Sequence, residues 1–337
     1  MSLSITGPIS ASQINTELGR SSTAQFSWGD ATFRKLTNLL GSTATIDADS
    51  GRGSSYIGTT TTNVTLTTKY GTPPQSGVYK FLIDSGVIVG GSSATSLVVG
   101  QFPAGSTIYV YNYGGVEGSS GVTNGGAGGD AINANYGSQT VNITNQVGAY
   151  IYAGGGGGGN GGSGGSGGVG GNGYYDSYVY RSCGPDYAYL TYNTGIGCAK
   201  NVTYWDNYAR NYTTGGAGGA GGSGGAGGVG QGYGQTNTGG SSGGAGAAGA
   251  AGGTNAGAGG SGGNGGVGGG GGAWGSPGAG GATGDTGGTG ASGNNGAGAA
   301  GATGSGGVSA GSAGRYLVKG SNSVTLTNYG SLAGGLA

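Results

Sequence analysis

Glycine recurs with a period of three along the second half of the chain. Between 161 and 173, two of every three residues are glycine. The third position there holds Ser163, Ser166, Val169 and Asn172. The same pattern returns at 215–230 and 259–272, and every third residue is glycine from 275 to 296. These stretches are internal repeats of one short unit and not a random tract of low complexity.

This period matches a polyproline-II-type helix, which has about three residues per turn, a rise of ~3.1 Å per residue and no internal hydrogen bonds. If two edges of such a helix carry only glycine, neighbouring backbones can approach closely and pair their N–H and C=O groups. The third edge, with Ala, Ser, Val or Asn, would face outwards or line a thin seam. The sequence therefore predicts a sandwich of packed polyglycine-II helices.

Two alternatives remain for the glycine zone. A collagen triple helix has the same period but carries ~15–20% or more proline, whereas this chain has 6 prolines in 337 residues. A flexible Gly/Ser linker is the thermodynamic default, because glycine loses more entropy on folding than any other residue. Ser and Ala do not intrude at the glycine edges of the best repeats, however, and this regularity favours packed helices.

Glycine content divides the chain, since 68 of the 96 glycines lie between 154 and 314. The expected fold is mostly β and irregular, with a short helical segment before it and polyglycine-II helices with variable tip loops after it. The expected domains are an N-terminal attachment module at 1–55, a β-rich domain at 56–123, a glycine-rich domain at 124–314 with an insertion at 174–213, and a strand cap at 315–337.

The N-terminal stretch carries two short helix signals. Ser10 and Gln13 form a capping box, and a second run with helical apolar spacing extends from Ser27 to Leu40. Both helices are too short to be stable alone. They either cap this chain's own core or attach it to another protein, and the second interpretation is favoured because no large core is nearby. The residues expected to make the attachment are Ile14, Leu18, Phe26, Trp28, Phe33, Leu36 and Leu39.

The next region is rich in Val, Ile, Thr and Tyr, in runs separated by Gly, Pro and Ser at a spacing of roughly ten residues. Short strands repeated in this way indicate either a sandwich or a β-helical stack. The expected strand regions are 60–68, 77–89, 97–99, 106–113, 141–147 and 150–152.

An island at 174–213 interrupts the glycine repeats. It holds 10 of the 22 tyrosines, a tryptophan and both cysteines. Tyr and Trp supply large contact areas at low entropic cost, as in recognition loops, which favours a binding surface. The alternative is that these aromatic side chains pack together as a small core of the island itself. Turns around Tyr233 and Trp274 are expected to join the island at one tip. The candidate binding residues are Tyr178, Tyr180, Tyr187, Tyr189, Tyr192, Tyr204, Trp205, Tyr208, Tyr233 and Trp274.

Cys183 and Cys198 are the two cysteines of the chain. A disulfide between them would close a loop of about 16 residues and add ~3 kcal/mol in the chain-entropy model. The alternative is a pair of free, buried thiols.

Composition excludes several classes of function. The chain has no histidine, which removes Ser-His-Asp and Cys-His catalysis and imidazole zinc sites. Its carboxylates are scattered, so the sequence indicates no glycosidase-like acid pair. Its formal net charge is zero, so it lacks the basic surface typical of nucleic-acid binding. No apolar run reaches the ~18 residues of a membrane-spanning helix. We therefore expect no enzyme activity, metal, cofactor, nucleic-acid partner or membrane insertion. The first residues lack the pattern of a secretory signal, so we expect synthesis in a cytoplasm without export by that route.

Four segments resemble the receptor-recognising adhesins at the tip of T-even-type bacteriophage long tail fibres. NGGAGGDAI and VNITNQVGAYIYAGGGGGGNGG are similar to the entry into that family's glycine-rich region. The end, GRYLVKGSNSVTLTNYGSLAGGLA, is similar to its closing segment, and SQINTELGRSS to a segment of phage tail proteins.

The resemblance implies a polyglycine-II sandwich whose loops bind an outer-membrane protein or surface glycan of a Gram-negative host. It also implies an N-terminal module seated on a trimeric tail-fibre protein, at the distal end of the fibre in the virion. The alternative function is a structural glycine-rich protein of a virion or cell surface, without a receptor-binding role.

Overall fold

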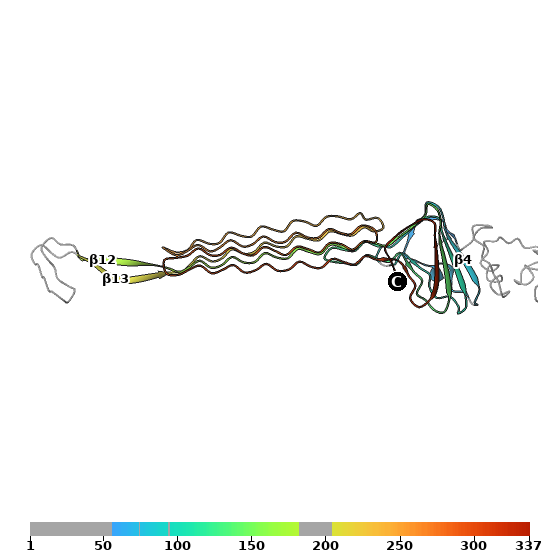
Figure 1. The fold of residues 1–337 in the computed structure, drawn as a ribbon, viewed down its shortest axis with the longest axis horizontal. Coiled ribbons are helices and arrows are strands. Elements are labelled where there is room, and N and C mark those ends of the chain that lie inside the picture. Colours follow the sequence, from blue (N-terminus) through green and yellow to red (C-terminus); the bar gives the residue numbers. More distant parts are fainter. Residues whose placement is uncertain (1–55, 74, 94, 182–203) are drawn as a thin grey trace, which may run out of the picture.

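The computed structural model describes residues 56–73, 75–93, 95–181 and 204–337, with the backbone alone for 178–181 and 204–209. A compact β domain stands at one end of a long, thin bundle, and a hairpin extends from the other end (Figure 1). The predicted attachment residues, from Ile14 to Leu39, lie outside the described residues. So do Cys183, Cys198, Tyr187, Tyr189 and Tyr192.

The β domain is a three-sided parallel β-helix of five coils, in which each coil gives one strand to each of three sheets. The first sheet contains β1 (Tyr56–Ile57), β4 (Val78–Ile83), β7 (Thr107–Asn112), β10 (Thr140–Asn145) and β15 (Ser323–Asn328). The second contains β2 (Thr61–Thr62), β5 (Ile88–Gly90), β8 (Gly115–Glu117), β11 (Tyr150–Tyr152) and β16 (Ser331–Ala333). The third contains β3 (Val64–Thr65), β6 (Leu97–Val98), β9 (Ile132–Asn133), β14 (Arg315–Val318) and β17 (Gly335–Leu336).

This architecture confirms the expectation of a mostly β protein. Of the two β arrangements that the sequence left open, the structure has the β-helical stack. In β4, β7 and β10 alternate residues are buried, as expected for strands with one face on a core. The parallel register stacks equivalent positions, so that Phe81, Val110 and Ile143 form one column of the hydrophobic core.

A ladder of asparagines closes one corner of the β-helix. The Asn112 Nδ2 donates to Asn145 Oδ1, and the Asn145 Nδ2 donates to Asn328 Oδ1, both at 2.8 Å. Asn112 and Asn145 are fully buried. Because buried amides must be paired, this ladder fixes the register of coils three, four and five.

One predicted strand region is wrong in part. The region 60–68 holds two short strands of different sheets, β2 and β3, and α3 (Leu66–Tyr70) follows β3 directly. Leu66 is fully buried in the core, and the Tyr70 ring packs 5.4 Å from that of Phe81. The need to bury these two side chains turns the chain at a point where its threonines favour a strand.

The glycine zone is an insertion within the fourth coil. The chain leaves the β-helix after β11 and returns at β14, where the Gly314 N–H donates to the Gly154 carbonyl at 2.9 Å. Between these points it runs back and forth in extended segments, which we call the glycine bundle (Figure 1). The segments are 154–172, 214–231, 238–253, 256–273, 276–293 and 296–314.

Hydrogen bonds between bundle segments repeat every third residue. In the central segment, 154–172, the N–H groups of a first set, every third residue from Gly155 to Gly170, donate to carbonyls of 214–231 at 2.8–2.9 Å. The N–H groups of a second set, every third residue from Gly156 to Gly171, donate to carbonyls of 276–293 at 2.8–3.0 Å. Carbonyls at the third position accept from 296–314 at 2.8 Å. A Cβ at a glycine in either of the first two sets would collide with the backbone of a neighbouring segment. Only the third position has room for a side chain.

The domain boundaries drawn from glycine content cut across this architecture. Strands from the expected domains 56–123 and 124–314 and from the expected cap 315–337 share the same three sheets. The last residues do not form a separate cap, because β14 completes the fourth coil and β15 to β17 form the fifth. Local composition could not show this, since the strand pairing joins residues up to 185 positions apart.

We expect Gly164→Ala to destabilise the bundle by about 3 kcal/mol, because its Cβ would collide with the Gly263 carbonyl in the bundle interior. Gly306→Ala is the matched control, since a Cβ there meets nothing within 4 Å. Chemical unfolding followed by circular dichroism would measure both. Equal stability of the two variants would contradict the tight packing.

A second test concerns the asparagine ladder. Asn145→Ala removes the middle amide of the ladder, and the buried Asn112 Nδ2 loses one of its two acceptors and keeps the Tyr150 carbonyl, so we expect a loss of about 2 kcal/mol in the free energy of unfolding. Asn142→Ala, on the outward side of the same strand, should cost less than about 0.5 kcal/mol. Thermal melts of both variants would compare the two positions, and a similar loss at Asn142 would count against the ladder.

Candidate functional site

The far end of the bundle carries an antiparallel hairpin formed by β12 (Gly173–Arg181) and β13 (Tyr204–Thr213). It extends beyond the bundle, away from the β-helix (Figure 1). Its outer half contains five of the predicted binding residues, whose strand positions are known and whose side chains are not described: Tyr178, Tyr180, Tyr204, Trp205 and Tyr208. Trp205 pairs with Tyr180, and Tyr208 lies where the register shifts.

Two further turns lie beside the base of this hairpin, at 253–256 and 293–296. The Asn294 N–H donates to the Asn255 carbonyl at 3.1 Å, and the Asn295 N–H donates to the Asn172 carbonyl at 3.0 Å. The hairpin and these two turns therefore form one tip, which we call the distal tip.

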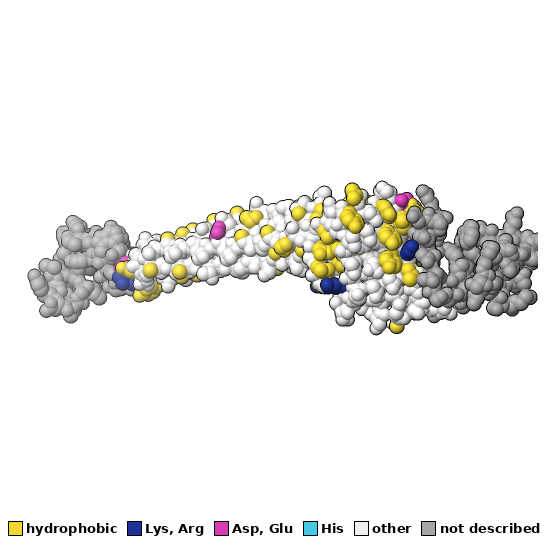
Figure 2. All heavy atoms as spheres, turned by 45° about the vertical axis from the view of Figure 1, so that its right-hand side comes forward, with side chains coloured by type: hydrophobic (Ala, Val, Ile, Leu, Met, Phe, Trp, Pro, Cys, Tyr) yellow, Lys and Arg dark blue, Asp and Glu magenta, His cyan; other side chains and the backbone are white. Residues whose placement is uncertain are grey.

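A charged and aromatic cluster lies on one side of the hairpin base. The Arg210 guanidinium contacts Asp176 at 3.1 Å and lies 4.0 Å from the centre of the Tyr174 ring. The hydrogen bond to Asp176 raises the pKa of Arg210, so the guanidinium keeps its positive charge. Tyr212 lies on the same face and is 68% exposed, whereas Tyr175 is 41% exposed and points to the opposite face. In Figure 2, the bundle surface between this cluster and the β-helix is largely uncharged.

Tyr233 and Trp274 lie at the opposite end of the bundle, so the prediction that they join the island is wrong. The Tyr233 ring lies over Gly90 on the second sheet, where a Cβ would collide with it. The Trp274 ring is 5.7 Å from that of Tyr152, which stacks on Tyr150 at 4.7 Å. Both aromatic residues therefore hold the proximal turns of the bundle against the β-helix.

The error has two causes. Turns of an up-and-down bundle alternate between its ends, so the turn around Tyr233, which is the first after the island, lies at the proximal end. The next turn, at 253–256, is made of small residues and is hard to recognise, and counting it places Trp274 at the proximal end as well. The available signal was Thr254–Asn255, where the glycine period breaks and Asn255 adopts a left-handed φ of 58° that asparagine tolerates well.

Tyr150 shows how the junction with the bundle is built. Its hydroxyl donates to Glu117 at 2.8 Å, and its ring lies over Gly115, where a Cβ would collide with it. Burial, together with the hydrogen bond and charge of Glu117, raises the pKa of Tyr150 well above its usual value. The phenol therefore stays protonated and remains a hydrogen-bond donor throughout the physiological range.

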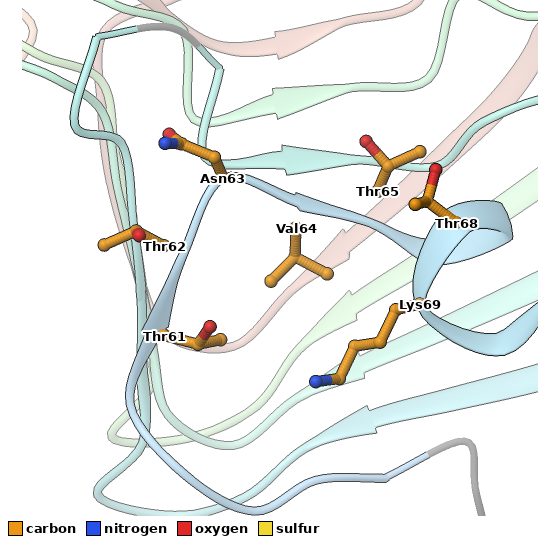
Figure 3. Close-up of a pocket in the computed structure, with 7 residues that line it drawn as sticks. All are labelled: Thr61, Thr62, Asn63, Val64, Thr65, Thr68 and Lys69. Carbon is orange, nitrogen blue, oxygen red and sulfur yellow. The ribbon is translucent and has the colours of Figure 1, made fainter.

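A shallow hollow of about 220 Å³ lies in the first coil, remote from the distal tip. Its lining residues are Thr61, Thr62, Asn63, Val64, Thr65, Thr68 and Lys69 (Figure 3). Lys69 is the one charged residue among them, and no carboxylate lines the hollow, so it offers no acid–base pair.

Two other kinds of site were sought in the part of the chain that the structure describes. There, no group of three or more Cys, Asp or Glu residues is placed to hold a metal ion. In the same residues, no helix has both the length and the apolar character needed to cross a membrane.

The chain was compared with known families, proteins and structures. The family model described as phage tail fibre adhesin Gp38 matches residues 43–245, which is more than half of the chain. No curated protein matched. One similar solved structure is described as the gp37-gp38 adhesin tip complex of the bacteriophage S16 long tail fiber; it is 16% identical, with 99% of this chain and 100% of that chain covered. Its TM-score of 0.24 is too low to support an argument about the fold.

The proximal anchor can be tested with Tyr233→Ala. Removing a ring packed on the second sheet should cost about 2 kcal/mol and speed amide hydrogen exchange in the turn 231–238. Tyr212→Ala, at an exposed tyrosine of the hairpin, is the control and should leave that turn protected. Exchange that is equally fast in the wild type and in Tyr233→Ala would show that the ring anchors nothing.

Proposed function

The chain belongs to the Gp38 family of phage tail fibre adhesins, and on this premise we propose that its glycine bundle is a rigid stem that presents the β12–β13 hairpin to a receptor on the host cell. Family membership places the chain on a phage tail fibre. The position of the hairpin carries the proposal about the receptor, because β12 and β13, the two ends of the tyrosine-rich island, project from the end of the bundle that points away from the β-helix (Figure 1).

We propose that the bundle segments are polyglycine-II helices. Hydrogen bonds at every third residue join a central segment to its neighbours, and some neighbours run parallel to it while others run antiparallel. Such a mixture suits a helix with about three residues per turn, whose N–H and C=O groups point outward in several directions. It does not suit a β-sheet, in which each strand pairs on two sides only.

Recognition by this tip requires no chemistry at the receptor. The exposed Tyr175 and Tyr212 and the ionised Arg210 provide aromatic and charge-assisted contacts, for which an outer-membrane protein or a surface glycan is the proposed partner. A hairpin held on a stiff stem loses little entropy on binding. Tyr178, Tyr180, Tyr204, Trp205 and Tyr208, together with Tyr187, Tyr189 and Tyr192 of the same island, remain the proposed contact residues.

The opposite end is the proposed attachment to the fibre. The first coil of the β-helix lies farthest from the hairpin and is the coil nearest in sequence to the predicted attachment residues, from Ile14 to Leu39 (Figure 1). The similar solved structure is described as a complex of gp37 with gp38 at a long-tail-fibre tip. We accordingly propose a trimeric tail-fibre protein as the partner at this end.

The receptor proposal is tested by replacing residues 175–212 with a short Gly-Ser turn. We expect the variant to lose at least about tenfold in affinity for host cells, because the aromatic surface is gone. Circular dichroism and a thermal melt would verify that the bundle survives. The control is Tyr233→Ala, which alters the proximal turn and should bind like the wild type.

Unchanged binding by the hairpin replacement would contradict the proposal and move the receptor site elsewhere. A wild-type protein that fails to bind, in an assay in which whole virions adsorb, would favour a purely structural role for the chain.

A further inference from the structure

We propose that Asn255 and Asn294 are positioning residues that fix the direction of the receptor-binding hairpin. The inference rests on the function proposed above and deepens it. Neither residue belongs to the hairpin, since they come from the other two turns of the distal tip. Each reaches across with its side chain to the first strand of the hairpin.

Asn294 holds both polar backbone groups of one residue. Its Oδ1 accepts from the Tyr174 N–H at 2.8 Å, and its Nδ2 donates to the Tyr174 carbonyl at 3.0 Å. A primary amide is the side chain suited to this task, because it carries a donor and an acceptor in one plane. A carboxylate at this position could accept from the N–H and could not donate to the carbonyl.

Asn255 adds a second bond to the same carbonyl. Its Nδ2 donates to the Tyr174 oxygen at 3.1 Å, so this oxygen accepts from two different turns. The left-handed backbone of Asn255, with a φ of 58°, places the residue at the tightest point of its turn. Gly173 lies directly against the Asn255 backbone, where a Cβ would collide.

The second strand of the hairpin is fastened independently. The Thr213 Oγ1 donates to the Thr254 carbonyl at 2.6 Å, and the Gly215 N–H donates to Asn172 Oδ1 at 3.3 Å. Both strands are therefore held where they leave the bundle, next to Gly173 and Gly215.

The hairpin needs this restraint for a physical reason. A two-stranded hairpin is marginally stable by itself in water, and described contacts with the rest of the molecule gather at its base. A loss of the asparagine bonds would let the hairpin pivot on its glycines. The fraction of molecules with the hairpin in the binding orientation would then fall, and the apparent affinity would fall by the same factor.

The experiment uses the full-length protein with the substitutions Asn255→Gly and Asn294→Ala. Glycine at 255 keeps the left-handed backbone and removes only the amide. The matched control is Asn237→Ala, which removes an asparagine amide that donates to the Gly271 carbonyl at 3.3 Å in a proximal turn. Whole host cells serve as the binding probe, and amide hydrogen exchange reports on the hairpin and the bundle separately.

We expect the double variant to bind host cells with an association rate constant about tenfold lower and a nearly unchanged dissociation rate constant. Amides of β12 and β13 should exchange faster, while those of the bundle keep their protection. Asn294→Asp, which retains the bond from the Tyr174 N–H, should give a smaller effect on the association rate. The Asn237→Ala control should match the wild type in both measurements.

The inference is overturned if the double variant binds like the wild type, or if exchange in β12 and β13 does not change. It is also overturned if only the dissociation rate rises, since that result would make the asparagines direct receptor contacts. Failure of the wild type to bind host cells would refute the proposed function instead. The exchange measurement would still decide whether the asparagines hold the hairpin.

Discussion

The backbone hydrogen bond between neighbouring glycine segments is the interaction on which the shape of this molecule depends. Each such bond brings two backbones so close that a Cβ on the inner side would collide with a carbonyl. At least one position in three must therefore be glycine, and two in three in the central segment 154–172, although glycine loses the most entropy on folding. The bundle offsets this cost by pairing the backbone of its central segment with four neighbouring segments, 214–231, 256–273, 276–293 and 296–314. Few large apolar side chains are needed.

The β-helix is stabilised by packed side chains instead, and it forms the base of the bundle. Its core is a stack of apolar side chains in register, closed at one corner by the buried ladder of Asn112, Asn145 and Asn328. The fourth coil is completed only after the chain has built the bundle and returned. The Tyr233 and Trp274 contacts then fasten the proximal turns of the bundle to the second sheet. Base and stem are thus joined at two levels, by the shared coil and by these aromatic anchors.

A fixed bundle that carries a separate hairpin suits an adhesin. The third position of each Gly-Gly-X repeat is free to vary, and Gly173 is the one glycine within β12 and β13. Substitutions in the hairpin can therefore change the surface presented to a host without disturbing the stem. Asn255 and Asn294 are the exception that we infer, because they connect the variable hairpin to the fixed geometry of the bundle.

The sequence by itself determined the local structure. The period of three marked the segments that pack together, runs rich in Val, Ile, Thr and Tyr at 77–89, 106–113 and 141–147 marked strand regions, and the tyrosine-rich island stood out by composition. Only the tertiary structure decided which segment pairs with which, how the last residues return to the β-helix, and at which end Tyr233 and Trp274 lie. The physical reason is that Gly-Gly-X segments are nearly interchangeable as hydrogen-bonding partners. Their neighbours are set by the number of turns and by contacts between residues far apart in the chain, and a local pattern records neither.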